Sequence, residues 1–353
     1  MKRLNDSTMK KRLIWLCLGM ALCLVACNDN GKNNNQGNDE PKVEEVDVTK
    51  DPLDLLNDSI TMDENRPDLY LRRASLLMSR EQVGMAMMDV NKAIQLDPKN
   101  VDALLMLSDI YYQMGDEANI TATLNKALEI DPYDARPMVK LAELNLLQQN
   151  FNLAFGYVDN ALKVSAYNPK AYFVKGMAYM ARQDTASALK NFLIAREQDG
   201  TFYDPQREIC NIYKAQHNPL VEGFMRSMVS TFPDVPMARY DLALFLQDNG
   251  HPTEALAHYD TLLQLSPDNS RLLFNKGYVY FVYLGENEKA LDYFNQSLQS
   301  DPNYLDALYN KGHVLEQMGD YVQAKSIYTQ VLKEKSNYRL AIDGMNRIAN
   351  QSE

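Results

Sequence analysis

The chain has 353 residues, of which 46% are hydrophobic, and a formal net charge of -11. This length is ample for a well-packed core. The acidic balance disfavours nucleic acid and anionic lipid as main partners, because both repel an acidic surface.

The amino-terminal end joins a basic segment to a short apolar run. Lys10, Lys11 and Arg12 precede residues 13–25, which carry no charge. This run is shorter than the roughly 20 residues that a bilayer-spanning helix needs, and the arrangement is typical of a secretory signal peptide. A buried helix or a short membrane anchor is the alternative. If translation started at Met9 and not at Met1, the signal peptide would be more compact.

The apolar run ends in Leu24-Val25-Ala26-Cys27, which resembles the lipobox of bacterial lipoprotein precursors. The resemblance implies a lipoprotein signal peptide over residues 1–26 and lipidation of Cys27. It also implies anchoring in the bacterial outer membrane, facing the periplasm or the cell surface, because Asn28 stands where an Asp would favour the inner membrane. Two or three acyl chains make a stable anchor, whereas one does not.

Residues 27–52 are rich in Asn, Gly and acidic side chains and contain few apolar ones. Such a segment cannot bury enough surface to offset its chain entropy, so we predict a disordered tether that starts at the lipidated Cys27. After signal cleavage, Cys210 is the only other cysteine left. No internal disulfide is therefore expected, and ordinary packing must hold the protein together.

From residue 65 onward the sequence repeats with a step of about 34 residues, which is typical of stacked supersecondary units. Asp97-Pro98 recurs as Asp131-Pro132, Ser266-Pro267 and Asp301-Pro302. We predict eight units: 65–98, 99–132, 133–166, 167–200, 201–233, 234–267, 268–302 and 303–336. End units expose a face that interior units bury, so we predict capping helices over 53–64 and 337–353.

Each unit contains two amphipathic stretches with apolar residues three and four apart, which predicts two helices. One position in the first stretch is always small: Ala74, Ser108, Ala142, Gly176, Cys210, Ala243, Gly277 and Gly312. Small residues allow two helices to approach closely, and aromatic residues fill the space beside them. Strand-like alternation is missing, so we predict an all-α fold.

This pattern resembles the tetratricopeptide repeat family, most closely in Asn310-Lys311-Gly312-His313, Gly319-Asp320-Tyr321 and the stretch from Ala324 to Tyr328. The resemblance extends over all eight units. It implies helix-turn-helix repeats stacked into a right-handed superhelical solenoid. It also implies that the first helix of each unit lines a concave groove that binds peptides or proteins.

Carried over by position, the resemblance places side chains of the last three units in that groove. These candidate partner-binding residues are Tyr240, Arg271, Phe274, Tyr278, Phe281, Tyr309 and His313. The spacing of Phe274, Tyr278 and Phe281 predicts a single stripe on one helix, with Tyr309 beside it. Exposed aromatic clusters usually mark a partner site, and ordinary packing is the alternative.

The sequence contains no recognisable catalytic, metal or cofactor motif. His217, His251, His258 and His313 lack HExxH spacing and have no cysteine pair beside them. A Gly-rich phosphate loop and a G-x-S-x-G elbow are also missing. Cys210 occupies the small-residue position and is predicted to be a buried spacer. We therefore expect no enzyme activity, no cofactor and no metal.

Residues 201–233 form the irregular unit. Val221 and Met228 stand where other units mostly have small residues, and His217-Asn218-Pro219 interrupts the turn between the helices. Local repacking is one interpretation, and a hinge between the units on either side is the other.

The functional hypothesis is a non-catalytic, lipid-anchored scaffold or adaptor of the bacterial cell envelope that binds a peptide or protein in its groove. The alternative is a glycan- or nutrient-binding envelope lipoprotein whose aromatic rings stack on sugars. Met237, Leu244 and Val282 mix with the rings, and such apolar neighbours favour a peptide.

Overall fold

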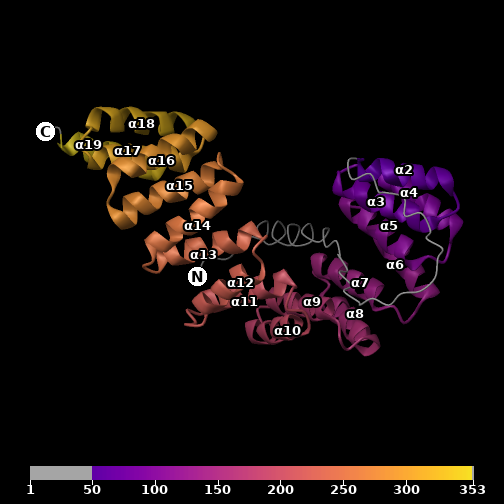
Figure 1. Cartoon of the computed structure of the whole chain (residues 1–353). Helices are drawn as coiled ribbons and strands as arrows, with labels where there is room; N and C mark the ends of the chain where they lie inside the picture. The colour runs from indigo at the N-terminus through magenta and orange to yellow at the C-terminus, as the bar shows by residue number, and fades with distance from the viewer. Residues whose placement is uncertain (1–49, 352–353) are drawn as a thin grey trace, which may run out of the picture. The chain divides into compact units, whose positions relative to one another are not determined.

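The computed structural model describes residues 50–351 and is helical from end to end of that range, with no strand in it (Figure 1). The all-α prediction is confirmed. No helix between residues 50 and 351 is long and apolar enough to cross a membrane. The predicted signal peptide over 1–26, the lipidation site Cys27 and most of the predicted tether lie outside the described residues.

The helices follow one another in pairs. Helix α2 (Pro52–Met62) precedes the first pair, and α19 (Arg339–Gln351) follows the last. The first four pairs are α3 (Pro67–Ser79) with α4 (Val83–Leu96), α5 (Val101–Met114) with α6 (Glu117–Ile130), α7 (Ala135–Leu147) with α8 (Phe151–Val164), and α9 (Pro169–Ala181) with α10 (Thr185–Gln198).

The remaining pairs are α11 (Tyr203–Ala215) with α12 (Val221–Thr231), α13 (Pro236–Asp248) with α14 (Pro252–Leu265), α15 (Ser270–Tyr278) and η1 (Val279–Leu284) with α16 (Asn287–Ser300), and α17 (Leu305–Gln317) with α18 (Tyr321–Glu334). Each of the eight predicted units contains one pair. The described residues divide into two compact parts, 50–205 and 206–351, and the boundary falls inside α11.

The helix boundaries follow from local chemistry. Asn100 and Asp116 cap α5 and α6, because their side chains accept hydrogen bonds from backbone N–H groups of the first turn. Gly115 ends α5 in the left-handed region at φ +72°, where glycine carries no steric penalty. The N–H of Asp116 then donates to the Tyr111 carbonyl, 2.9 Å away, and this bond closes the turn between the two helices.

Where the small residue is a glycine, in the fourth, seventh and eighth pairs, a large aromatic side chain on the second helix of the pair explains it. A Cβ added to Gly277 would lie 2.8 Å from the Phe294 ring, and one added to Gly312 would lie 2.8 Å from the Tyr328 ring. Both rings are fully buried. The ring of the second helix therefore rests directly on the backbone of the first, and a larger residue at this position would separate the pair.

The irregular pair of α11 and α12 is packed with bulkier side chains. Cys210, Val221 and Met228 are all buried, and the Cys210 Sγ lies 3.2 Å from the Met228 Sδ. Cys210 is a buried free cysteine, as expected of a spacer between helices. The burial of Val221 and Met228 agrees with local repacking of this pair. The hinge between the neighbouring units stays a prediction.

The first helix of the seventh pair changes from α to π geometry at Val279. Helix α15 contributes 9 residues and η1 a further 6, whereas the first helices of the other pairs have 13 or 14. The N–H of Glu286 donates to the Tyr280 carbonyl, six residues back, whereas the equivalent bond from Asp320 reaches Leu315, five residues back. The extra residue of this unit therefore lies between Tyr280 and Glu286, and it widens the helix.

Candidate functional site

Aromatic side chains gather on the first helices of the last three pairs. We call this surface the aromatic face and define it by Tyr240, Phe274, Tyr278, Phe281, Tyr283, Tyr304, Tyr309, His313 and Tyr338. Its rings lie within residues 206–351, and most of them form two rows.

The first row runs along α15 and η1. The Phe274 ring centroid lies 6.0 Å from that of Tyr278, and the Tyr278 centroid lies 6.2 Å from that of Tyr283. Phe274 also contacts Tyr304 at 5.1 Å and the buried Phe294 at 5.7 Å. Phe274 thus links the core of its pair to a row of rings that reaches the surface.

The second row runs from η1 across α17 to the start of α19. The Phe281 centroid lies 5.0 Å from the His313 ring, which lies 5.8 Å from Tyr309. Tyr309 in turn lies 5.7 Å from Tyr338. Burial lowers the pKa of His313, so its imidazole is neutral near pH 7 and packs against the rings as an uncharged group.

The two rows correct the expectation of a single stripe. The α-helical spacing of Phe274, Tyr278 and Phe281 would place all three rings together, but the helix becomes π after Tyr278. Phe281 contacts His313 of the next pair, and Tyr283 takes its place beside Tyr278. The wider turn is the physical reason for the change.

Tyr309 is part of the core. Only 8% of its surface is exposed, and its ring stacks on the buried Tyr328 at 5.9 Å. The sequence-based expectation treated the last pair like an interior one, but Tyr338, at the entry to α19, covers Tyr309 from outside the pair. The other candidate residues on the aromatic face are half-buried or exposed.

Two candidates lie at the edge of the rows. The Tyr240 hydroxyl accepts a hydrogen bond from the Asn275 side-chain amide at 3.1 Å, and its ring lies 6.4 Å from Tyr259. Arg271 is exposed and makes no ion pair with any residue that the structure describes. Tyr240 is therefore anchored from two sides, while Arg271 is available to solvent.

Two carboxylates, which the sequence did not single out, adjoin the rings. Asp248 accepts a hydrogen bond from the Tyr283 hydroxyl at 2.9 Å, and Asp306 accepts one from the Tyr338 hydroxyl at 2.9 Å. Burial, followed by the hydrogen bond to Asp248, raises the pKa of Tyr283 to about 12, so this hydroxyl stays protonated and donates.

An ion pair between the partly exposed Arg347 and the buried Glu316 links α19 to α17. Glu316 is 5% exposed in its side chain and accepts from Arg347 Nε at 2.6 Å, Arg347 Nη2 at 2.8 Å and the Tyr328 hydroxyl at 2.6 Å. Burial alone would raise the pKa of Glu316, but the hydrogen bonds from Arg347 and Tyr328 and the Arg347 charge outweigh it and lower the pKa. The carboxylate is thus ionised and fixed at the end of the second row.

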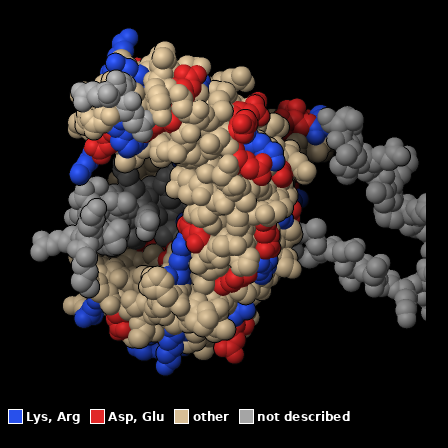
Figure 2. All heavy atoms as spheres, turned by 90° about the vertical axis from the view of Figure 1, so that its left-hand side faces the viewer, with Lys and Arg blue, Asp and Glu red and all other residues tan. Residues whose placement is uncertain are grey.

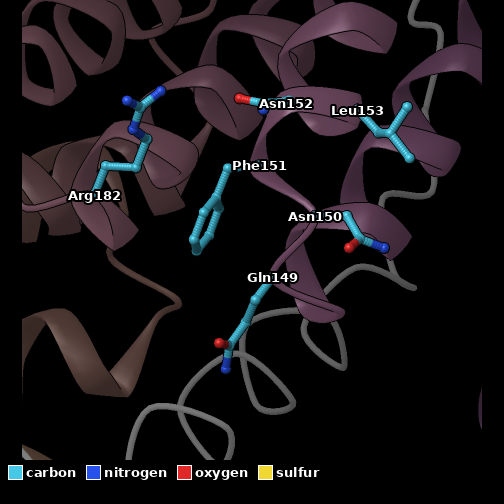
Figure 3. Close-up of a pocket in the computed structure, with 6 residues that line it drawn as sticks. All are labelled: Gln149, Asn150, Phe151, Asn152, Leu153 and Arg182. Carbon is cyan, nitrogen blue, oxygen red and sulfur yellow. The ribbon is translucent and has the colours of Figure 1, made fainter.

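No group of three His, Cys, Asp or Glu side chains that could hold a metal ion occurs in residues 50–351. A surface pocket of about 450 Å³ lies elsewhere, at the turn between α7 and α8 (Figure 3). It is lined by Gln149, Asn150, Phe151, Asn152, Leu153 and Arg182. None of the candidate residues named from the sequence lines it.

Comparison with known families identifies the helix pairs in two stretches of the chain. Family models described as tetratricopeptide repeat match residues 67–100, 101–134, 240–304 and 281–342. Residues 67–134 and 240–342 thus match tetratricopeptide repeats. The last two matches include α13 from Tyr240 onward, α15, η1 and α17, so the aromatic face lies within the matched residues. A search of curated proteins found no match.

Similar solved structures include a protein that is titled as TPR repeat-containing. A chain of the crystal structure of the APC/C hetero-tetramer Cut9-Hcn1 is 18% identical, with a TM-score of 0.52 over 84% of this chain. This chain spans 58% of that one. The C-terminal part of a TPR repeat-containing protein from Cytophaga hutchinsonii is 16% identical, with a TM-score of 0.58 over 68% of this chain and 99% of that one.

A third structure is YrrB, titled a TPR protein with an unusual peptide-binding site. It is 23% identical and covers 53% of this chain and 97% of its own, with a TM-score of 0.45. At identities this low, the two structures with higher TM-scores show the fold alone.

Proposed function

We propose that the protein is a non-catalytic scaffold that binds a peptide or protein partner on the aromatic face. The observation that carries this proposal is the row of Phe274, Tyr278 and Tyr283, which starts against the buried Phe294 ring and ends at the surface. Tyr283 is 38% exposed and Val282, beside it, is 49% exposed. Clustered rings of this kind supply large contact area at low entropic cost, and they commonly anchor partners.

Glycan binding is the competing proposal, and the polar groups of the face argue against it. A sugar needs hydrogen-bond partners around the stacked ring, but the hydroxyls of Tyr240, Tyr283 and Tyr338 each already make one hydrogen bond, with Asn275, Asp248 and Asp306, which leaves them fewer bonds to offer. Val282 adds an exposed apolar group next to the rings. A mixed wall of this kind suits the side chains of a peptide better.

We further propose that the scaffold is lipid-anchored in the bacterial outer membrane through Cys27. The support is the sequence Leu24-Val25-Ala26-Cys27 behind a basic and apolar signal, followed by a tether rich in Asn, Gly and acidic residues. The anchor and the aromatic face are independent proposals, and each has its own test.

Replacing Cys27 by serine is expected to abolish labelling with a radioactive or clickable fatty acid and to release the protein from membranes. The hydroxyl of serine cannot form the thioether that holds the lipid, and no other acyl site is predicted. Fractionation after a high-salt wash measures the result. If the Cys27→Ser protein stays with the membrane after that wash, the anchoring proposal is wrong.

Replacing Tyr278 by alanine is expected to weaken partner binding by about 1–3 kcal/mol while changing the melting temperature little, because the ring is half-buried and contacts the half-buried Phe274 and the exposed Tyr283. The binding target is a peptide selected from a display library on the immobilised chain. Tyr321→Ala, at the outer surface of α18, is the matched control. A loss of about 3 kcal/mol in the free energy of unfolding would instead show that Tyr278 is a core residue.

A further inference from the structure

Asp248, the last residue of α13, is a carboxylate set among tyrosines without a cationic partner. Its Oδ1 accepts hydrogen bonds from the Tyr283 hydroxyl at 2.9 Å and from the Gln247 side-chain amide at 3.3 Å. No Lys, Arg or His of residues 50–350 forms an ion pair with it. The carboxylate is therefore positioned by neutral hydrogen-bond donors, and no positive charge pairs with it.

The rings beside Asp248 present faces that attract cations. Tyr283 meets Tyr278 at an interplanar angle of 69°, so the two rings form a corner next to the carboxylate. A Lys or Arg group within about 6 Å of such a ring is attracted by its quadrupole. A carboxylate adjoining the same rings adds a direct charge partner.

The chain itself contains this arrangement with a cation in place. Lys276 is paired with Asp260, donates to the Tyr293 hydroxyl at 2.7 Å, and lies 4.2 Å from the Tyr293 ring centroid. One carboxylate and one tyrosine thus hold a nearly buried ammonium group. Asp248, with Tyr278 and Tyr283, supplies the same two components at the surface.

We infer that Asp248, Tyr278 and Tyr283 bind a lysine or arginine side chain of the partner peptide. This inference rests on the proposed function and adds the chemistry of the partner. The net charge of -11 favours a basic partner as well. Acidic and basic side chains are interspersed on the surface seen in Figure 2, without a large patch of one sign, so selectivity has to come from local groups such as Asp248.

Arg271 represents the opposite possibility. It is an exposed cation at the edge of the aromatic face, near Tyr304, where its charge lowers the pKa of that tyrosine against the larger effect of burial. An acidic peptide would use Arg271. The Asp248 site is favoured because it joins a carboxylate to two rings, whereas Arg271 is a single flexible group on an acidic protein.

The test uses the full chain and a display library of random twelve-residue peptides. Selected peptides are expected to be enriched in Lys or Arg among aromatic and aliphatic residues. For a selected peptide, Asp248→Asn is expected to raise the Kd about tenfold in fluorescence anisotropy. The same peptide with its Lys or Arg replaced by glutamine is expected to bind weakly to the unchanged protein. Asp248→Asn is expected to weaken the binding of this second peptide little further, because both changes remove the same interaction.

Matched variants separate local from general effects. Asp292→Asn removes an exposed carboxylate from the outer helix α16, so an effect of overall charge would weaken binding equally there. Tyr283→Leu removes the ring and the hydroxyl, whereas Tyr283→Phe removes the hydroxyl alone and is expected to have the smaller effect. Arg271→Gln is expected to leave a cationic peptide bound as tightly or more tightly. Circular dichroism melting checks that each variant is folded.

The outcomes distinguish this inference from the function on which it rests. Selection of acidic peptides, with binding lost in Arg271→Gln and kept in Asp248→Asn, would overturn the cation site and leave peptide binding intact. Selection of uncharged peptides insensitive to both variants would also overturn it. If no peptide is selected by the full chain, the proposed function fails and the inference fails with it.

Discussion

Replacing Tyr328 by alanine is expected to lower the free energy of unfolding by about 4 kcal/mol, the range for deleting a large buried ring. Tyr328 is fully buried between two glycines: a Cβ on either Gly312 or Gly344 would overlap its ring. Its hydroxyl also donates to the buried Glu316 at 2.6 Å. The substitution therefore leaves a cavity between α17 and α19 and takes a hydrogen bond from a buried carboxylate.

The control is Tyr321→Ala on the same helix. Tyr321 is 38% exposed on α18, so its removal is expected to change stability by less than about 1 kcal/mol. Urea unfolding followed by circular dichroism compares the two variants. Similar midpoint shifts for Tyr328→Ala and Tyr321→Ala would contradict the packing described for the last pair.

Replacing Gly176 by alanine is expected to destabilise the protein by about 1–3 kcal/mol, although alanine is the better helix former. The added methyl group would overlap the Phe192 ring, which is fully buried and has no room to move away. Helices α9 and α10 must separate to admit it. The effect is that of overpacking, and thermal or urea unfolding measures it.

The same substitution at Gly156 is expected to have the opposite sign. Gly156 lies in the interior of the neighbouring helix α8, and an added Cβ there would meet no atom within 4 Å. Alanine at such a position stabilises a helix by about 0.5–1 kcal/mol relative to glycine. If both alanines stabilise the protein, the close approach of Phe192 to Gly176 is wrong.

The fold could be predicted from the sequence because its determinants are local and repeated. The recurring small residues, such as Gly277 and Gly312, mark the contact of two helices that are neighbours in the chain. The aromatic residues that rest on them, Phe294 and Tyr328, follow within the same unit. A pattern of this kind requires no knowledge of distant contacts, and eight copies of it reinforce one another.

The details of the aromatic face could be predicted only in part. The extra residue of the seventh unit is visible in the sequence. Its position depends on which backbone hydrogen bonds form, and these place it in η1 and not in the turn before α16. The contact of Asp248 with Tyr283 joins residues 35 positions apart and follows from that choice. Tyr309 is buried because Tyr338 covers it, which a comparison of equivalent positions does not reveal.

The π turn also shows that the exposed side of a first helix can change while the packing between the two helices of a pair stays the same. Gly277 and Phe294 pack in the seventh pair as Gly312 and Tyr328 do in the eighth, although the seventh carries one more residue. The insertion is absorbed before Gly285, so α16 and everything after it keep their places. A repeat array can thus gain or lose a residue at the open end of a first helix and alter what that surface recognises, while the mutual alignment of its layers is conserved.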